Sequence, residues 1–114
     1  MASREPYDLR EVRRIVLQHL EGRDAEVYLY GSWATGRNRR TSDIDVGILP
    51  RKRLPIELWW EIKDALENSL VIQEVDLVDL SQTSAAFRKR VRGEGVLWSG
   101  SKRESGSRGK LGKR

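Results

Sequence analysis

Apolar positions recur along the chain with two different periods, which predict alternating helices and strands. Residues 8–21 carry apolar side chains three and four positions apart with charged residues opposite them, as an amphipathic helix does, and Asp8 is the expected N-cap. A second helix is expected to begin at Pro55. Its apolar stripe contains Leu58, Trp59, Ile62, Leu66 and Leu70. Residues 84–92 predict a weaker helix, which Gly93 should end.

Short runs rich in β-branched and aromatic residues predict the strands between these helices. They cover residues 26–30, 44–49, 73–80 and 96–98, and Pro50 should end the second of them. Helices and strands in this order predict an α+β fold. We expect an α/β two-layer arrangement, in which a small mixed β-sheet is covered by helices.

Length and composition predict one domain over residues 1–99. The chain has 114 residues, the size of one small domain, and no cysteine, which excludes disulfides and zinc sites that need sulfur. No stretch approaches the roughly 20 apolar residues of a membrane span, and the N-terminus is charged where a signal peptide is apolar. We therefore expect a cytoplasmic protein without a membrane partner.

The positive charge lies almost wholly at the C-terminus. The net charge is +5, and residues 100–114 carry six Lys or Arg and one Glu, which leaves sixteen charges of each sign in residues 1–99. Gly, Ser and basic residues dominate this segment, so we expect a disordered basic tail. Its role is either to keep the protein soluble or to bind phosphates of a nucleic acid or an acidic partner.

Three aspartates are the strongest chemical signal in the sequence. Asp43 and Asp45 lie two residues apart on a predicted strand, so both side chains point to one face, and Asp76 lies in the middle of another strand. Such clustered carboxylates repel one another unless a cation neutralises them, and carboxylates without histidine suit Mg²⁺. The alternative is that Asp43 forms a turn after Ser42 while Asp45 is solvated on an edge strand.

A Gly-Ser pair follows the first predicted strand. Gly31 lets the backbone approach a ligand closely, the short helical turn after it directs amide donors at an anion, and Ser32 adds a hydroxyl group. Alone, the pair is also compatible with an ordinary strand-to-helix turn. Together with Asp43 and Asp45 it favours a phosphate site.

These residues resemble a known family. Gly31-Ser32, ten residues, and then Asp43-Ile44-Asp45, followed later by "EVDLVDL", is similar to the signature of the DNA polymerase β-type nucleotidyltransferase superfamily, and the loop resembles its minimal nucleotidyltransferase (MNT) branch. The resemblance covers about residues 8–98. It implies a polymerase β-like fold that uses ATP with Mg²⁺, two ions being expected.

The resemblance also implies a role for each candidate residue. Asp43, Asp45 and Asp76 would be the catalytic and metal-binding residues, and Gly31, Ser32 and Ser42 would bind the nucleotide. In the MNT branch the partner is commonly a HEPN protein, an all-helical ribonuclease toxin, which the MNT antitoxin inhibits by adding AMP to its tyrosines. Two alternatives stay open: a module that neutralises the HEPN partner by contact alone, or a transferase that acts on a small molecule. Oligomeric state is also open, and a homo-oligomer is compatible with the sequence.

Trp33 departs from the family pattern, because many relatives carry Arg at this position. That puts one phosphate contact in doubt, for which arginines of the following loop could compensate. We expect Trp33 to be partly exposed and to contact nucleotide or partner, the alternative being that it packs on its own short helix. Trp59 and Trp60 cannot share one helix face, so one of them should be exposed. His19 is expected to have a packing or surface role.

Overall fold

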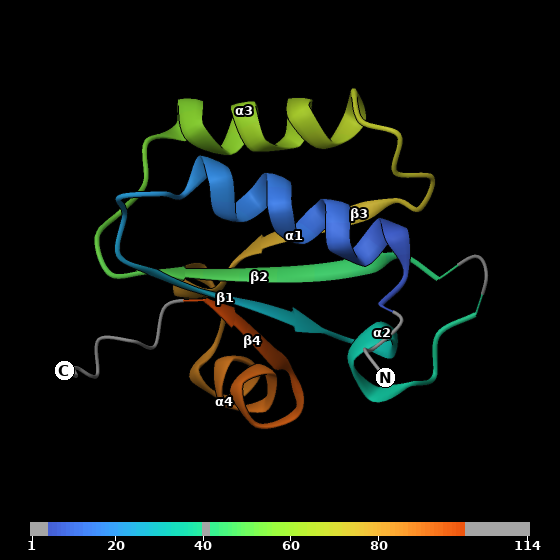
Figure 1. Ribbon diagram of the computed structural model, residues 1–114. Helices are drawn as coiled ribbons and strands as arrows, with labels where there is room; N and C mark the ends of the chain where they lie inside the picture. The colour runs from blue at the N-terminus through green and yellow to red at the C-terminus, as the bar shows by residue number, and fades with distance from the viewer. Residues whose placement is uncertain (1–4, 40–41, 100–114) are drawn as a thin grey trace, which may run out of the picture.

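A mixed four-stranded sheet forms the middle of the protein (Figure 1). The computed structural model describes residues 5–39 and 42–99, so the expected basic tail at 100–114 lies outside the described residues. The elements are α1 (Tyr7–His19), β1 (Ala25–Tyr30), α2 (Ser32–Thr35), β2 (Ile44–Pro50), α3 (Ile56–Glu67), β3 (Val75–Asp79), the 3₁₀ turn η1 (Leu80–Gln82), α4 (Ala85–Glu94) and β4 (Val96–Ser99).

The strands lie in the order β3-β2-β1-β4. β1 is antiparallel to both β2 and β4, whereas β2 and β3 are parallel. The parallel pair requires a crossover connection, which α3 provides. The end of β1 and the starts of β2 and β3 therefore meet at one end of the sheet, where α2 also lies (Figure 1).

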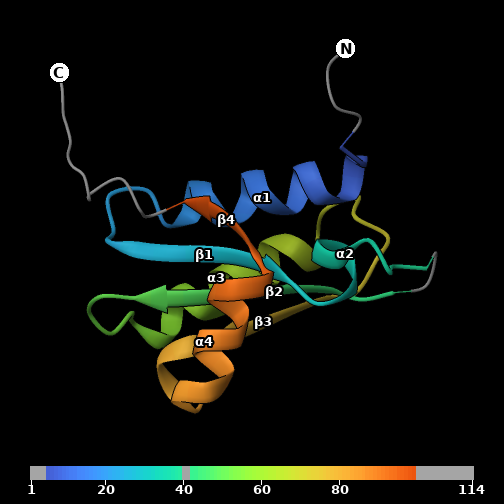
Figure 2. The ribbon, with the colours of Figure 1, turned by 90° about the horizontal axis from the view of Figure 1, so that it is seen from below.

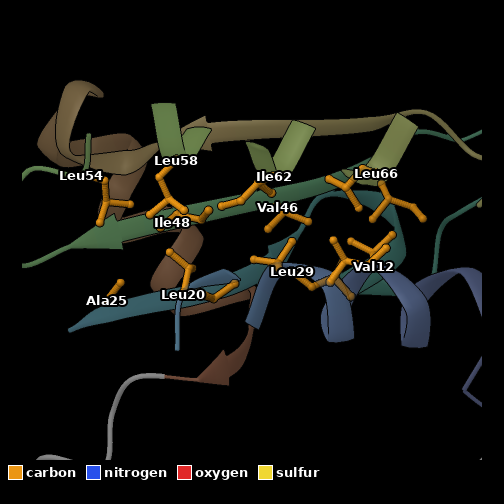
Figure 3. Close-up of a cluster of buried hydrophobic side chains, with 14 of the residues drawn as sticks. Val12, Leu20, Ala25, Leu29, Val46, Ile48, Leu54, Leu58, Ile62 and Leu66 are labelled. Atoms are coloured by element: carbon orange, nitrogen blue, oxygen red, sulfur yellow. The ribbon is translucent and has the colours of Figure 1, made fainter. Parts of the chain in front are cut away.

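Helices α1 and α3 lie side by side on one face of the sheet, where the main core forms (Figures 1 and 3). The apolar stripes of both helices face inward, against the strand residues that point to the same side. The fully buried members include Val12, Val16, Ile44, Val46, Ile48 and Ile62. Burial of these side chains, at about 25 cal/mol per Å² of apolar surface, is the main term that holds this layer on the sheet.

Helix α4 covers part of the opposite face of the sheet (Figure 2). A smaller buried cluster of Tyr28, Leu80 and Val91 fixes it there. Gly47 makes room for this packing, because a Cβ at that position would lie 2.9 Å from the Leu80 side chain. The remainder of this face, toward the end where α2 lies, carries the candidate site.

The predicted fold class is confirmed, with shifts at the element boundaries. β2 includes Pro50 as its last residue, and β3 is shorter than the predicted strand 73–80. Helix α4 continues through Gly93 and ends before Gly95, so the prediction that Gly93 ends it was wrong. Leu70 does not belong to the apolar stripe of α3, because the helix ends at Glu67 and Leu70 is 80% exposed.

Asp8 does not cap α1 as predicted. The helix begins at Tyr7 with Pro6 at the N-cap position, and no side chain caps it. The Asp8 carboxylate instead accepts hydrogen bonds from the backbone amides of Ile72 (3.0 Å) and Gln73 (3.1 Å). It therefore joins the start of α1 to the loop that leads into β3. No helix in the described part of the chain is long and apolar enough to cross a membrane.

Candidate functional site

Asp45 and Asp76 lie side by side on neighbouring strands. They are register partners in the parallel pair β2–β3, where strands run about 4.8 Å apart, so both carboxylates project from the same face. This is the face that α4 only partly covers. Asp43 lies just before β2, two residues from Asp45, and is exposed, as is Asp76. The structure thus brings the three predicted aspartates to one end of one sheet face.

The three carboxylates interact electrostatically. Partial burial raises the pKa of the Asp45 carboxyl above its ordinary value, and the negative charges of Asp76 and Asp43 raise this pKa further. The shift shows that Asp45 lies within electrostatic reach of both other aspartates. A cation or a proton at this position would relieve the repulsion.

The Gly31 turn packs directly against Asp45. Gly31 has φ 76° and ψ −155°, a backbone conformation essentially restricted to glycine, and a Cβ at this position would collide with the Asp45 carboxylate. The Gly31 carbonyl accepts the amides of Ala34 (3.0 Å) and Thr35 (3.2 Å). Ser32 and Trp33 also stand in the first turn of α2, so their amides have no acceptor within the helix itself.

Ser42 fixes the loop that precedes Asp43. Its hydroxyl accepts a hydrogen bond from the Arg39 amide (2.7 Å), and its own amide donates to the Arg39 carbonyl (3.0 Å). The Ser42 carbonyl accepts a bond from the Trp33 indole Nε1 (3.1 Å). The hydroxyl predicted to bind nucleotide is thus engaged within the loop. The predicted partial exposure of Trp33 is confirmed, but its ring packs against the main core, whereas the alternative expected it to pack on its own short helix.

Tyr30 belongs to the site and was missed by the sequence analysis. It is the register partner of Asp45 in the antiparallel pair β1–β2, so Tyr30, Asp45 and Asp76 form one row across three strands. Partial burial raises the pKa of Tyr30 to about 12, with further contributions from the charges of Asp45 and Asp76. Its hydroxyl therefore stays protonated at neutral pH. The sequence feature that could have predicted Tyr30 is its position one residue before Gly31, in a strand next to the one that carries Asp45.

A small hollow adjoins this row. It has a volume of about 150 Å³ and is lined by Tyr30, Gly31, Phe87, Arg90, Val91 and Glu94. The Tyr30 ring meets Phe87 edge-on, with the centroids 5.6 Å apart, so β1 and α4 form its two walls. The hollow connects the Gly31 turn to α4.

The donor set fits a hard divalent cation. Within residues 5–39 and 42–99, no three His, Cys, Asp or Glu side chains form a ready-made metal cage. Two neighbouring carboxylates with a third nearby nevertheless match Mg²⁺, which binds through one or two carboxylates, substrate phosphates and several waters. The placement of Asp45 beside Asp76, with Asp43 two residues away, favours a cation here. The pKa of Asp45 agrees with this, because it is raised first by burial and then by the charges of Asp76 and Asp43.

Four other polar or aromatic residues, Asp79, His19, Trp59 and Trp60, lie outside this site. The Asp79 carboxylate accepts bonds from the amide and hydroxyl of Ser81, as a cap of η1. His19 Nδ1 lies 2.8 Å from the Ile15 carbonyl at the end of α1. Trp60 is 65% exposed, while Trp59 packs against the core, so the predicted division between the two tryptophans is confirmed.

The chain is similar to known proteins. The family model "Polymerase beta, Nucleotidyltransferase" matches residues 22–104. The "Protein adenylyltransferase MntA" of Shewanella oneidensis is 37% identical over 73 residues, 63% of this chain and 52% of the relative, so the chain spans about half the length of that protein. The "Probable protein adenylyltransferase MntA" of Haemophilus influenzae is 32% identical over 69% of this chain and 68% of its own.

A solved structure is also similar. It is a chain of a crystal structure of a toxin-antitoxin with AMP-PNP, which matches with a TM-score of 0.63 at 28% identity and covers 81% of this chain and 76% of that chain.

Proposed function

This chain belongs to the polymerase beta nucleotidyltransferase family, and from that premise we propose that it is an Mg²⁺-dependent enzyme that transfers AMP from ATP to a hydroxyl group of a partner protein. The observation that carries the proposal is the apposition of the Gly31 turn and the Asp45 carboxylate, beside Asp76. A turn that offers amides to phosphates thereby adjoins carboxylates that suit a cation. Two MntA relatives bear the name protein adenylyltransferase, which favours AMP as the transferred group.

In this proposal the acceptor oxygen attacks the α-phosphorus of ATP. The bond from that phosphorus to the bridging oxygen of the β-phosphate breaks, and pyrophosphate leaves. Asp43, Asp45 and Asp76 would hold Mg²⁺, which supplies charge stabilisation for the phosphates. The Ser32 hydroxyl and the first-turn amides orient the phosphate chain. Asp76, exposed at the edge of the row, accepts the proton of the attacking hydroxyl.

Tyr30 has a supporting part in this arrangement. Its phenol is neutral at pH 7, as an ordinary tyrosine is, and the pKa raised to about 12 keeps it neutral in alkaline solution as well, so it adds no third negative charge to its row. Its ring packs edge-on against Phe87 of α4, and its strand position is directly opposite Asp45. Tyr30 therefore joins the aspartate row to α4.

The proposed acceptor is a HEPN-type toxin. A similar chain comes from a toxin-antitoxin complex with AMP-PNP, and the sequence resembles the MNT branch, whose antitoxins modify HEPN partners. The proposal includes one or two Mg²⁺ ions and ATP as the nucleotide. Inhibition by contact alone is the second candidate, because the similar chain was solved in a toxin-antitoxin complex.

The test is to incubate the chain with ATP, Mg²⁺ and a HEPN protein, and to measure the mass of the intact partner by mass spectrometry. We expect a mass gain of one or more AMP groups, lost when Asp43 and Asp45 are both replaced by Asn. A stable complex without any mass gain would replace this proposal by inhibition through contact. Pyrophosphate release that depends only on small hydroxyl compounds would instead indicate a small-molecule acceptor.

A further inference from the structure

Trp33 connects the two halves of the site. We propose that it is a positioning residue, whose indole Nε1 ties the Gly31-Ser32 turn to the loop before Asp43 and so makes the binding of nucleotide and divalent cation cooperative. The inference rests on the proposed function only for the identity of the two ligands. The hydrogen bond from the Trp33 indole to the Ser42 carbonyl, called the tie below, is present without them.

The indole has a fixed place. The Trp33 ring is partly buried against the main core, and its Nε1 donates to the Ser42 carbonyl at 3.1 Å, across nine residues of sequence. Trp33 directly follows Ser32 in α2, so the ring belongs to the element expected to hold the phosphates. A displacement of this turn therefore acts on Ser42 through the indole.

Ser42 passes that constraint to Asp43. Its amide and hydroxyl both bond to the backbone of Arg39, so three hydrogen bonds converge on this one residue. Asp43 follows immediately and lies outside β2. The first residue of β2 is Ile44, whose amide donates to the Glu74 carbonyl (2.8 Å). The sheet fixes Asp45 by its register, whereas Asp43 depends on Ser42 for its position.

The consequence is reciprocal coupling. Phosphates that order the Ser32 turn also order Ser42 and Asp43, so a cation gains a better placed ligand, and by linkage the cation improves nucleotide binding by the same factor. Loss of one hydrogen bond of ordinary net strength corresponds to about a two- to tenfold change in an equilibrium constant. We expect the coupling to fall by about this factor without the indole N–H.

Trp33→Phe is the test variant, because it keeps an aromatic ring on the core and removes the N–H donor. Trp59→Phe is the matched control: Trp59 also packs partly buried against the same core, and its indole makes no hydrogen bond to any residue in the described ranges. Two measurements apply. Amide exchange at Arg39 and Ser42 is followed by NMR without ligands, and Mg²⁺ affinity is measured by calorimetry with and without a non-hydrolysable ATP analogue.

For Trp33→Phe we expect faster exchange at both amides and a two- to tenfold smaller effect of the analogue on Mg²⁺ affinity, with Trp59→Phe like the wild type. Unchanged exchange, or equal coupling in both variants, would overturn the inference. If Trp33→Phe does not fold, exchange of the Trp33 indole N–H in the wild type tests the same tie. Exchange as fast as that of the indole N–H of Trp60, which is 65% exposed, would refute it. If the wild-type chain binds nucleotide and cation independently, the coupling is refuted. If it binds neither ligand, the proposed function is refuted. In that case the amide-exchange data still show whether the Trp33 indole fixes the loop at Ser42.

Discussion

Gly31→Ala tests whether the turn and Asp45 are apposed as the structure has them. Gly31 has φ 76° and ψ −155°, and its Cα faces the Asp45 carboxylate so closely that a Cβ would collide with it. The substitution therefore adds two penalties: strain in a backbone region that alanine avoids, and forced movement of Asp45. Neither penalty requires a change elsewhere in the fold.

The two penalties differ in their effect. Residues held in such backbone regions cost on the order of 1–3 kcal/mol, which in a domain of this size corresponds to a fall in Tm of roughly 4–8 °C for each kcal/mol. Movement of Asp45 acts on the chemistry. A displacement of about 1 Å in a reacting group can cost about 100-fold in rate, so we expect at least about a 100-fold loss of AMP transfer.

Gly22→Ala is the matched control. Gly22 also has a positive φ, 84°, but a Cβ there would meet nothing within 4 Å, and it lies in the turn between α1 and β1, at the other end of β1 from Gly31. We expect it to lose stability on the order of 1–2 kcal/mol, with normal transfer. Thermal unfolding and a timed AMP-transfer assay measure both properties. If Gly31→Ala transferred AMP at the rate of Gly22→Ala, the apposition of turn and carboxylate would have no functional meaning.

Three further predictions follow from other contacts. Asp8→Ala should lower the free energy of unfolding by about 1–3 kcal/mol, since two loop amides lose their acceptor. Glu11→Ala removes only an ion pair on the surface of α1 and should have a smaller effect, and urea unfolding compares the two variants. Asp45→Asn should stabilise the metal-free protein at neutral pH, because a carboxyl group whose pKa is raised in the folded state lowers the free energy of unfolding as pH rises. The gain in stability should shrink as pH falls through that pKa and vanish below about pH 4. A gain that persists below about pH 4 would contradict the assignment. Deletion of residues 100–114 should leave Tm nearly unchanged. If the basic segment binds phosphates, the deletion should also weaken the salt dependence of RNA binding, and equal salt slopes for the two proteins would exclude that role.

Local pattern predicted most of the fold. The spacing of apolar residues located all but the shortest elements, because each helix buries one stripe and each strand one face. Leu70 was wrongly assigned to α3, because the side-chain bonds that end this helix cannot be predicted from the spacing of apolar residues. The Asn68 side chain donates to the Asp64 carbonyl (3.0 Å) and the Ser69 hydroxyl to the Leu66 carbonyl (2.6 Å), so the helix ends before the apolar pattern does.

The site was predictable where it depends on spacing along one strand. Asp43 and Asp45 share a face because they lie two residues apart, and Gly31 was suggested by its place after a strand. Tyr30 required the antiparallel register of β1 and β2, which the sequence does not state. The bond from Trp33 to Ser42 depends on how a loop returns to a helical turn. The bonds that Asp8 accepts from amides 64 and 65 residues away depend on tertiary packing.

The most direct test of nucleotidyl transfer at this site uses ATP labelled at one phosphate. The chain, Mg²⁺ and the HEPN protein are incubated with ATP labelled at the α-phosphate or, separately, at the γ-phosphate, and the partner is then isolated. We predict stable label on the partner from the α-position only, none from the γ-position, and none from either when Asp43 and Asp45 are replaced by Asn. Label from the γ-phosphate, or α-label that survives the double replacement, would contradict AMP transfer by these carboxylates.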